Sequence, residues 1–209
     1  MGVCVSVHTV ERALADEDAS VRRTRGAIAT KALGSRSNAT FVLHGTLARA
    51  DGANRNARVY PRETLTREVS AYDALRVKTG RAYGRLEHPR ASDAVRFRDA
   101  SGMDERETSH RVVETYWSDD GKELYGYVEV LLENAMGREV LAIYERGELL
   151  GASTRSWSGL EVRGDGRTYV DDDMELLAFD LVRNPSTVSL HAHGMLVPVD
   201  RAMYEWPKT

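Results

Sequence analysis

Alternating apolar and polar residues, the pattern of half-buried β-strands, recur along the chain from residue 41 onward. The predicted strands are Phe41–Leu47, Ala82–His88, His110–Trp117, Leu124–Leu132, the stretch Gly147–Gly159, Leu160–Arg163, Arg167–Val170, Leu176–Val182 and Val188–Val199. Two turn sequences between neighbouring runs, Asp119-Asp120-Gly121 and Asp165-Gly166, predict hairpins. Residues 90–107 are polar and have no clear period, which predicts a loop.

Two segments carry helical rather than strand periodicity. The first begins at Pro61, which suits the first turn of a helix, and ends before Gly80. Its apolar stripe is formed by Leu65, Val69 and Tyr72. The second is a short helix over Arg138–Arg146. Because strands outnumber helices without a regular strand–helix–strand alternation, we expect an α+β, mainly β fold, a mostly antiparallel barrel or sheet with helices packed around it.

Composition narrows the class of protein. The 209 residues, 42% hydrophobic and 29% charged, fit one soluble globular domain with a short appendage. The net charge of -3 gives no reason to expect a nucleic-acid partner, and no apolar run is long enough to predict a membrane span. The single cysteine, Cys4, excludes a disulfide framework and a cysteine-rich zinc site.

Residues 1–38 differ in composition from the rest. Between Ala19 and Thr40 this segment contains five basic residues and no acidic residue. These are Arg22, Arg23, Arg25, Lys31 and Arg36. We predict a flexible basic N-terminal arm over residues 1–38, with a removable propeptide or docking segment as the alternative, and a folded domain over 39–209.

Three residues from separate parts of the chain suggest nucleophilic chemistry. Ser153 follows a short apolar run and lies between glycines, His88 precedes a proline, and Asp180 interrupts an apolar strand. A serine becomes nucleophilic when a histidine, oriented by a third group, takes its proton. Structural explanations stay open for His88 and Ser153, which could cap a turn or bond to backbone, whereas an acid in an apolar strand needs a partner.

The other histidines give weaker signals. His191 and His193 would point the same way on a strand, but only Asp200 lies near them as a further ligand. We therefore expect no metal site and no cofactor. His44 and His110 are interpreted as structural or exposed.

Four motifs together resemble one known family. They are Asn54-Arg55-Asn56-Ala57-Arg58-Val59-Tyr60-Pro61, Gly84-Arg85-Leu86-Glu87-His88-Pro89, Gly151-Ala152-Ser153-Thr154-Arg155 and Phe179-Asp180-Leu181-Val182-Arg183-Asn184-Pro185-Ser186. Their order and spacing, from about Phe41 to about Ser186, resemble tailed-phage prohead core proteases, which are related to the herpesvirus assembly protease. The resemblance implies a serine endopeptidase with a compact, mostly antiparallel β-barrel surrounded by helices.

The resemblance also implies roles for individual residues. His88 would be the general base, Ser153 the nucleophile and Asp180 the third member, with Glu175 and Asp173 as alternatives. Backbone amides near Thr154 and Arg155 would bind the oxyanion, and the Arg155 side chain could assist by charge or pair with Asp180.

Two departures from the family pattern concern glycines. Ala57 stands where the family often has glycine in Asn-Gly-Arg. Ser156 stands where the family has glycine in Ser-Ser-Arg-Gly.

The partners implied by the resemblance are the scaffold or core protein and the major capsid protein, cleaved inside the prohead in the host cytoplasm, together with the protease itself. Nucleic acid and membrane are not implied, and a homo-oligomer is left open. The alternative from another class is a non-catalytic capsid-assembly or scaffold-binding protein with the same fold. A soluble esterase fits less well, because Arg155 interrupts the Gly-x-Ser-x-Gly motif.

Overall fold

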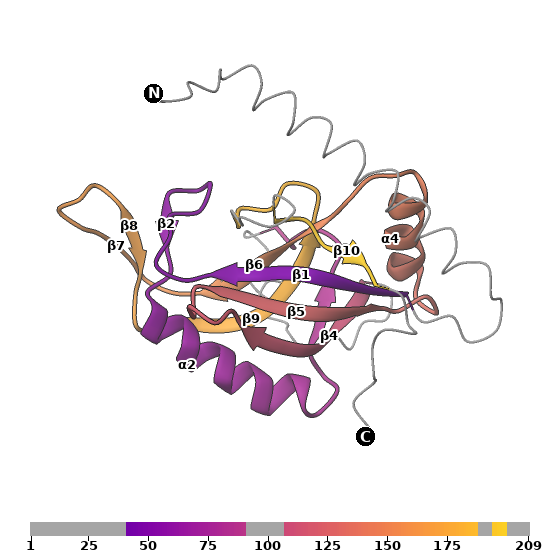
Figure 1. The fold of residues 1–209 in the computed structure, drawn as a ribbon, viewed down its shortest axis with the longest axis horizontal. Coiled ribbons are helices and arrows are strands. Elements are labelled where there is room, and N and C mark those ends of the chain that lie inside the picture. The colour runs from indigo at the N-terminus through magenta and orange to yellow at the C-terminus, as the bar shows by residue number, and fades with distance from the viewer. Residues whose placement is uncertain (1–40, 91–106, 188–193, 200–209) are drawn as a thin grey trace, which may run out of the picture.

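Strands dominate the structure, a computed structural model that describes residues 41–90, 107–187 and 194–199 (Figure 1). The strands are β1 (Phe41–Arg49), β2 (Arg58–Val59), β3 (Tyr83–Arg85), β4 (Thr108–Trp117), β5 (Glu123–Val130), β6 (Gly151–Trp157), β7 (Leu160–Val162), β8 (Thr168–Val170), β9 (Glu175–Val182) and β10 (Val197–Pro198). The helices are α2 (Arg62–Tyr72), which continues into a π-helical turn (Asp73–Val77), and α4 (Ala135–Glu145). The mainly β class is therefore confirmed. The predicted arm, residues 1–38, lies outside the described residues.

A five-stranded sheet in the order β10-β1-β5-β4-β3 forms the largest layer, and all its pairings are antiparallel. Its strands alternate as the sequence pattern predicts, with Leu43, Leu124 and Val128 on the face that joins the core. Irregular pairing at Thr46/Ala48 in β1 and at Val112/Glu114 in β4 adds local twist to this sheet.

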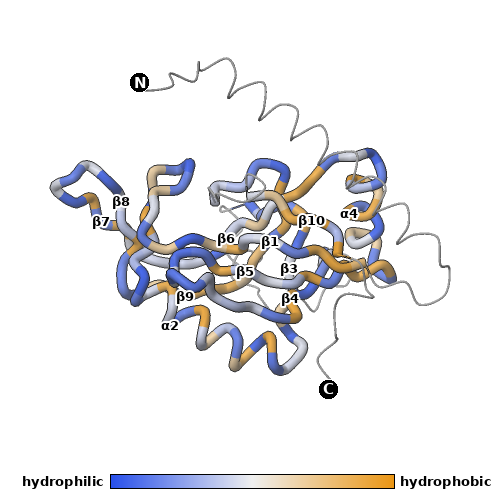
Figure 2. The backbone as a smooth tube through the Cα atoms, viewed as in Figure 1, coloured by the Kyte–Doolittle hydropathy of each residue, from blue (hydrophilic) through white to orange (hydrophobic). Residues whose placement is uncertain are grey.

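The helix α2 packs its apolar stripe against the core, as predicted. Leu65, Val69 and Tyr72 are buried, and the Tyr72 ring meets the Phe179 ring of β9 edge-on at 5.3 Å between centroids. Figure 2 shows how apolar and polar residues alternate along this helix. The helix therefore covers the strand that carries Asp180.

The second helix begins earlier than predicted, at Ala135 rather than Arg138. Gly137 conceals this start in the sequence, because glycine weakens a helix. In the structure a Cβ on Gly137 would lie 1.9 Å from the Leu131 carbonyl oxygen, so close packing requires a glycine there.

Two smaller sheets complete the fold. One pairs β6 with β9 antiparallel, and the other has the order β2-β8-β7, with β2 and β8 parallel. Among the described strands the three sheets are open, so their pairings do not close the predicted barrel. Residues of β1, β4, β5, β6 and β9 nevertheless share one hydrophobic cluster.

Several predicted strands are shorter in the structure, and the stretch Gly147–Gly159 is reduced to β6. The strand expected to reach His88 ends at Arg85, because Glu87 adopts a left-handed backbone with φ of 62°. The strand expected over Val188–Val199 is reduced, in its described part, to β10, and Gly194 with φ of 76° precedes it. His191, His193 and Asp200 lie outside the described residues. No helix in the described part of the chain has the length and hydrophobicity to span a bilayer.

Candidate active site

Ser153 and Asp180 lie directly opposite one another on the paired strands β6 and β9. Opposed residues of an antiparallel pair place their side chains on the same face, so the register alone brings this hydroxyl and this carboxylate together. Asp180 is fully buried and Ser153 is 6% exposed. Ser153 lies inside β6, which pairs with β9 along its whole length.

His88 reaches this pair from the segment that follows β3. Leu86 forms a parallel bridge with Leu181 of β9, and the Glu87 amide donates a hydrogen bond to the Leu181 carbonyl oxygen at 2.8 Å. The left-handed turn at Glu87 is secured by the Arg183 amide, which donates to its carboxylate at 3.1 Å. Non-glycine residues rarely adopt this conformation. The strained turn directs the backbone so that the His88 side chain lies against Ser153 and Asp180.

The three side chains form a continuous hydrogen-bonded chain. His88 Nδ1 lies 2.7 Å from Asp180 Oδ2, and His88 Nε2 lies 2.9 Å from Ser153 Oγ. An ionised carboxylate can only accept hydrogen bonds, so Nδ1 carries the proton and donates it to Asp180. The lone pair of Nε2 then faces the Ser153 hydroxyl, which is the arrangement a general base requires.

Asp180 is held as a carboxylate by several donors. Burial by itself would raise its pKa, but the hydrogen bond from His88 and the charge of Arg155 hold the pKa below its ordinary value. The Arg85 amide also donates to Asp180 Oδ1 at 2.9 Å, and Arg155 Nε lies 2.8 Å from Oδ2. Asp180, a buried acid in an apolar strand, therefore has the hydrogen-bond and charged partners that the sequence analysis expected.

The alternative acids lie elsewhere. Asp173 accepts a hydrogen bond from the Gly159 amide at 2.8 Å, and Glu175 is exposed at the beginning of β9. Of the three acids considered, it is Asp180 that contacts His88.

The side chains of the two residues after Ser153 point to different parts of the structure. The Arg155 side chain is buried against Asp180, which is the pairing that the sequence left open. Thr154 lines the cleft beside Ser153 and a smaller pocket next to it. Just beyond Arg155 the β6–β9 register shifts, so the strand bends next to the site.

A cleft of about 400 Å³ opens onto Ser153 and His88. Its walls come from the Asn54–Tyr60 segment, from the end of β6 and from the β7–β8 hairpin. Residues of these walls include Asn54, Arg58, Tyr60, Trp157, Leu160 and Val170. The sequence motif at Asn54–Pro61 marked this segment but suggested no role for it. A volume of this size is in the range of ligand-binding clefts.

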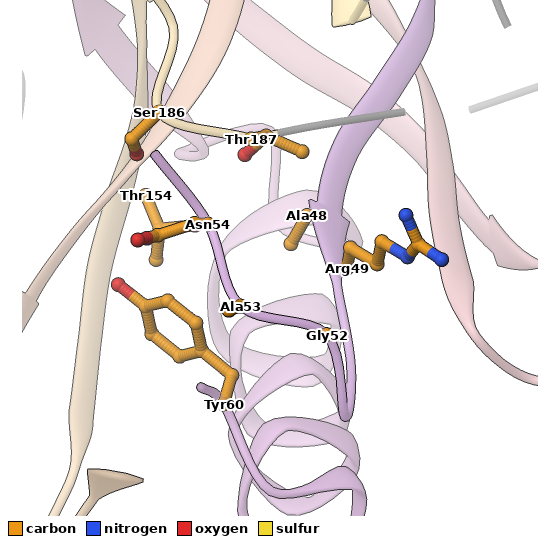
Figure 3. A pocket seen from close by; sticks show the side chains of 9 residues that line it. All are labelled: Ala48, Arg49, Gly52, Ala53, Asn54, Tyr60, Thr154, Ser186 and Thr187. Carbon is orange, nitrogen blue, oxygen red and sulfur yellow. The ribbon is translucent and has the colours of Figure 1, made fainter. Parts of the chain in front are cut away.

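The small neighbouring pocket is almost closed. Its volume open to water is about 10 Å³, room for a single water molecule. In Figure 3 the Tyr60 hydroxyl points toward Asn54 and Thr154, whereas Arg49 turns away from the pocket. Burial raises the pKa of Tyr60, while a hydrogen bond with Ser156 and the charge of Arg58 act in the opposite direction. Tyr60 is therefore a neutral wall between the pocket and the cleft.

The two departures from the family pattern have different structural consequences. Ala57 adopts φ of 57°, the left-handed region that glycine favours, within a turn closed by hydrogen bonds from the amides of Asn56 and Arg58 to Asn54 Oδ1. Ser156 lies in the strand β6 and is not among the described residues with positive φ. Position 156 therefore does not need glycine for its backbone conformation.

His110 lies beneath this site, where the sequence suggested only a structural or exposed residue. It is 1% exposed, its Nε2 lies 2.9 Å from the Phe179 carbonyl oxygen, and its Nδ1 lies 2.8 Å from Ser109 Oγ. Because a carbonyl only accepts, Nε2 carries the proton. Burial lowers the pKa of His110 to about 4, so it is neutral and holds the backbone next to Asp180. The structural interpretation of His110 is therefore confirmed, although the sequence did not indicate its position beside Asp180.

Comparisons with known proteins agree on one family. Residues 9–196 match the model of the family described as prohead core protein serine protease. The prohead core protein protease of Enterobacteria phage T4 is 26% identical over 148 residues, which cover 70% of this chain and 65% of that protein. The aligned part is thus slightly less than two thirds of the relative's length.

A solved structure is also similar. The bacteriophage T4 capsid assembly protease superposes with a TM-score of 0.59 at 23% identity, and the match covers 69% of this chain and 82% of that chain. At this identity the likeness concerns the fold.

Proposed function

The chain belongs to the prohead core protein serine protease family, and from this premise we propose that it is a serine endopeptidase of phage capsid maturation. The single observation that carries the proposal is the Ser153–His88–Asp180 chain of hydrogen bonds, with 2.9 Å and 2.7 Å between the successive pairs of atoms. It opens into a cleft of about 400 Å³, which gives a substrate access to the hydroxyl.

The proposed mechanism follows from the orientation of His88. Its Nε2 takes the Ser153 proton, and Oγ attacks the carbonyl carbon of a peptide bond to form a tetrahedral intermediate. The same nitrogen then gives the proton to the leaving amine, which leaves an acyl-enzyme that water hydrolyses. Asp180 keeps the Nδ1 proton in place and stabilises the imidazolium that forms.

We assign the oxyanion site to backbone amides at Thr154 and Arg155, the residues that follow Ser153 in β6. Such donors supply a large part of the rate enhancement in acyl transfer. The Arg155 guanidinium has a different task, because it is engaged by Asp180.

The substrates proposed on the basis of the family are the scaffold or core protein and the major capsid protein, and the protease itself. The proposed place of action is the interior of the prohead in the host cytoplasm, without a cofactor. We also propose that the three sheets together form a barrel-like body related to that of the herpesvirus assembly protease, which their common hydrophobic cluster supports. An experimental structure with separate cores for the sheets would contradict this.

The test is co-expression with the scaffold and capsid proteins of the same phage, combined with labelling by a fluorophosphonate, which reacts with activated serines. The wild type should cleave these proteins and take up label, whereas Ser153→Ala and His88→Ala should do neither. The matched control is Ser158→Ala, because this serine lines the same cleft without contacting His88 in the described structure. Identical fragments from wild type and Ser153→Ala, with no label at Ser153, would instead identify a non-catalytic assembly protein.

A further inference from the structure

Large apolar side chains are exposed next to the cleft, at the end of β6 and on one side of the β7–β8 hairpin. Trp157, Leu160 and Val162 are 46%, 47% and 73% exposed. The other exposed large hydrophobic residues of the described chain are Leu75 at 71% and Tyr116 at 40%, and neither belongs to β6 or to the hairpin. We call Trp157, Leu160 and Val162 the apolar strip.

The apolar strip continues the wall of the cleft. Trp157 and Leu160 line the cleft that holds Ser153, and Leu160 pairs with Val170, another lining residue. Val162 is two positions further along β7, so its side chain lies on the same face as that of Leu160. An extended chain leaving the cleft along β7 would meet these side chains in turn.

The opposite face of the hairpin is polar, and its side chains contact one another. Arg163 Nε lies 2.8 Å from Glu161 Oε2, and the Arg163 guanidinium stacks 4.1 Å from the centre of the Tyr169 ring. Tyr169 in turn donates a hydrogen bond to Asp165 Oδ2 at 2.8 Å. The hairpin is therefore amphipathic, and Leu160 and Val162 are exposed on its apolar face.

The hairpin is held in place at its base although it projects from the body of the molecule (Figure 1). The strand β8 pairs with β2 at Arg58 and Val59, and the Asp171 amide donates to the Gly159 carbonyl oxygen at 3.0 Å. Among the described strands, β7 is the outermost of this sheet and none pairs with its outer edge, so this row of backbone groups could pair with a further strand. A fixed edge strand with apolar residues at alternate positions is suited to bind an extended peptide by strand addition.

We propose that the apolar strip and the edge of β7 form a substrate-binding exosite. Its occupant is an extended segment of the protein substrate with apolar side chains at alternate positions, outside the residues that flank the scissile bond. This proposal rests on the proposed function, since it assigns the occupant as the substrate of Ser153. A second copy of the chain fits less well, because three side chains provide far less surface than the roughly 1,000 Å² of a stable interface.

The test compares two surface variants that leave the catalytic groups intact. Val162→Ser alters the most exposed side chain of the apolar strip, which does not line the cleft, and Glu161→Gln, on the opposite face of the same strand, is the matched control. The substrates are the scaffold protein of the same phage and a peptide of about eight residues that spans one of its cleavage sites. We expect kcat/KM on the scaffold protein to fall about tenfold in Val162→Ser, mainly through KM, with peptide cleavage and fluorophosphonate labelling unchanged.

The same two surface variants can also be made in the Ser153→Ala background, where their affinities for the scaffold protein are compared without cleavage. It tests the exosite even where labelling shows Ser153 to be unreactive, so failure of the exosite and failure of the proposed function are separable. Equal kcat/KM for Val162→Ser and the control on the scaffold protein, together with equal binding, would overturn the proposal. A parallel loss on the short peptide, or sedimentation showing that the apolar strip holds two copies together, would overturn it too.

Discussion

Ser153 faces Asp180 across the β6–β9 ladder, and the His88 ring bridges the two at 2.9 Å and 2.7 Å. The carboxylate is also bonded by the Arg85 amide and paired with the buried Arg155 guanidinium. The proposed nucleophile and its orienting acid are thus fixed by one strand register. Substitutions at the site and in the layer beneath it should therefore have separable effects on reactivity and stability.

Asp180→Asn should abolish most of the activity. An amide cannot accept the Nδ1 proton in the same way and favours the wrong tautomer of His88, so labelling and peptide cleavage should fall by about 10⁴-fold. The variant should also lose about 3–5 kcal/mol of unfolding free energy, because Arg155 is left buried without its carboxylate. The measurements are the rate of fluorophosphonate labelling per folded molecule and denaturant unfolding.

Two further variants separate these effects. Asp173→Asn, at the acid that caps Gly159, should keep nearly the full labelling rate. The double variant Arg155→Met/Asp180→Asn removes both buried charges and should recover stability without recovering reactivity. Full reactivity in Asp180→Asn would refute the assignment of Asp180.

Stability should fall as the pH falls from 7 to 5, and His110 should account for much of the change. Burial lowers the pKa of His110 from 6.5 to about 4. The unfolded chain therefore binds more protons than the folded chain between these values, and the free energy of unfolding should drop by about 2 kcal/mol between pH 7 and pH 5.

Denaturant unfolding of wild type and His110→Gln at the two pH values checks this prediction. The glutamine amide can still donate to the Phe179 carbonyl, so the variant should fold and show a smaller pH effect. His44, whose pKa is also lowered by burial, contributes in the same direction and is present in both proteins. An unchanged pH dependence in His110→Gln would contradict the prediction.

Gly84→Ala should disturb both stability and reactivity. A Cβ on Gly84 would lie 2.3 Å from His110 Nε2 and 2.3 Å from the Phe179 carbonyl oxygen, so β3 must move away from β9. We expect a loss of about 1–3 kcal/mol in unfolding free energy and slower labelling, because β3 leads directly to His88. Gly164→Ala is the control, since nothing lies within 4 Å of a Cβ there. Equal effects of the two substitutions would show that the packing around Gly84 is loose.

Ala57→Gly should stabilise the protein. Ala57 has φ of 57°, so a glycine relieves steric strain at the turn beside the cleft. The expected gain in unfolding free energy is about 0.5–1 kcal/mol after the greater entropy loss of glycine is included. The same substitution in the regular helix α2, Ala71→Gly, should have the opposite sign and a similar size. A destabilised Ala57→Gly protein would mean that this turn is not strained.

The sequence by itself determined the mainly β class, most of the strands and the helix that begins after Pro61. Local periodicity suffices for this, because it reports which residues of an element face the core. It also indicated that Asp180, an acid among apolar residues, required a partner. The two hairpin turns and the candidates Ser153 and His88 came from local signals as well.

Only the tertiary structure decided which of these residues meet. The contacts of His88 join residues 65 and 92 positions apart, and no local pattern encodes a strand register over such separations. The position of Ser153 within β6 follows from its pairing with β9, and the early end of β3 follows from the left-handed turn at Glu87. The burial of His110 and the ion pair between Arg155 and Asp180 depend on close packing of several strands, which forms only when the whole chain folds.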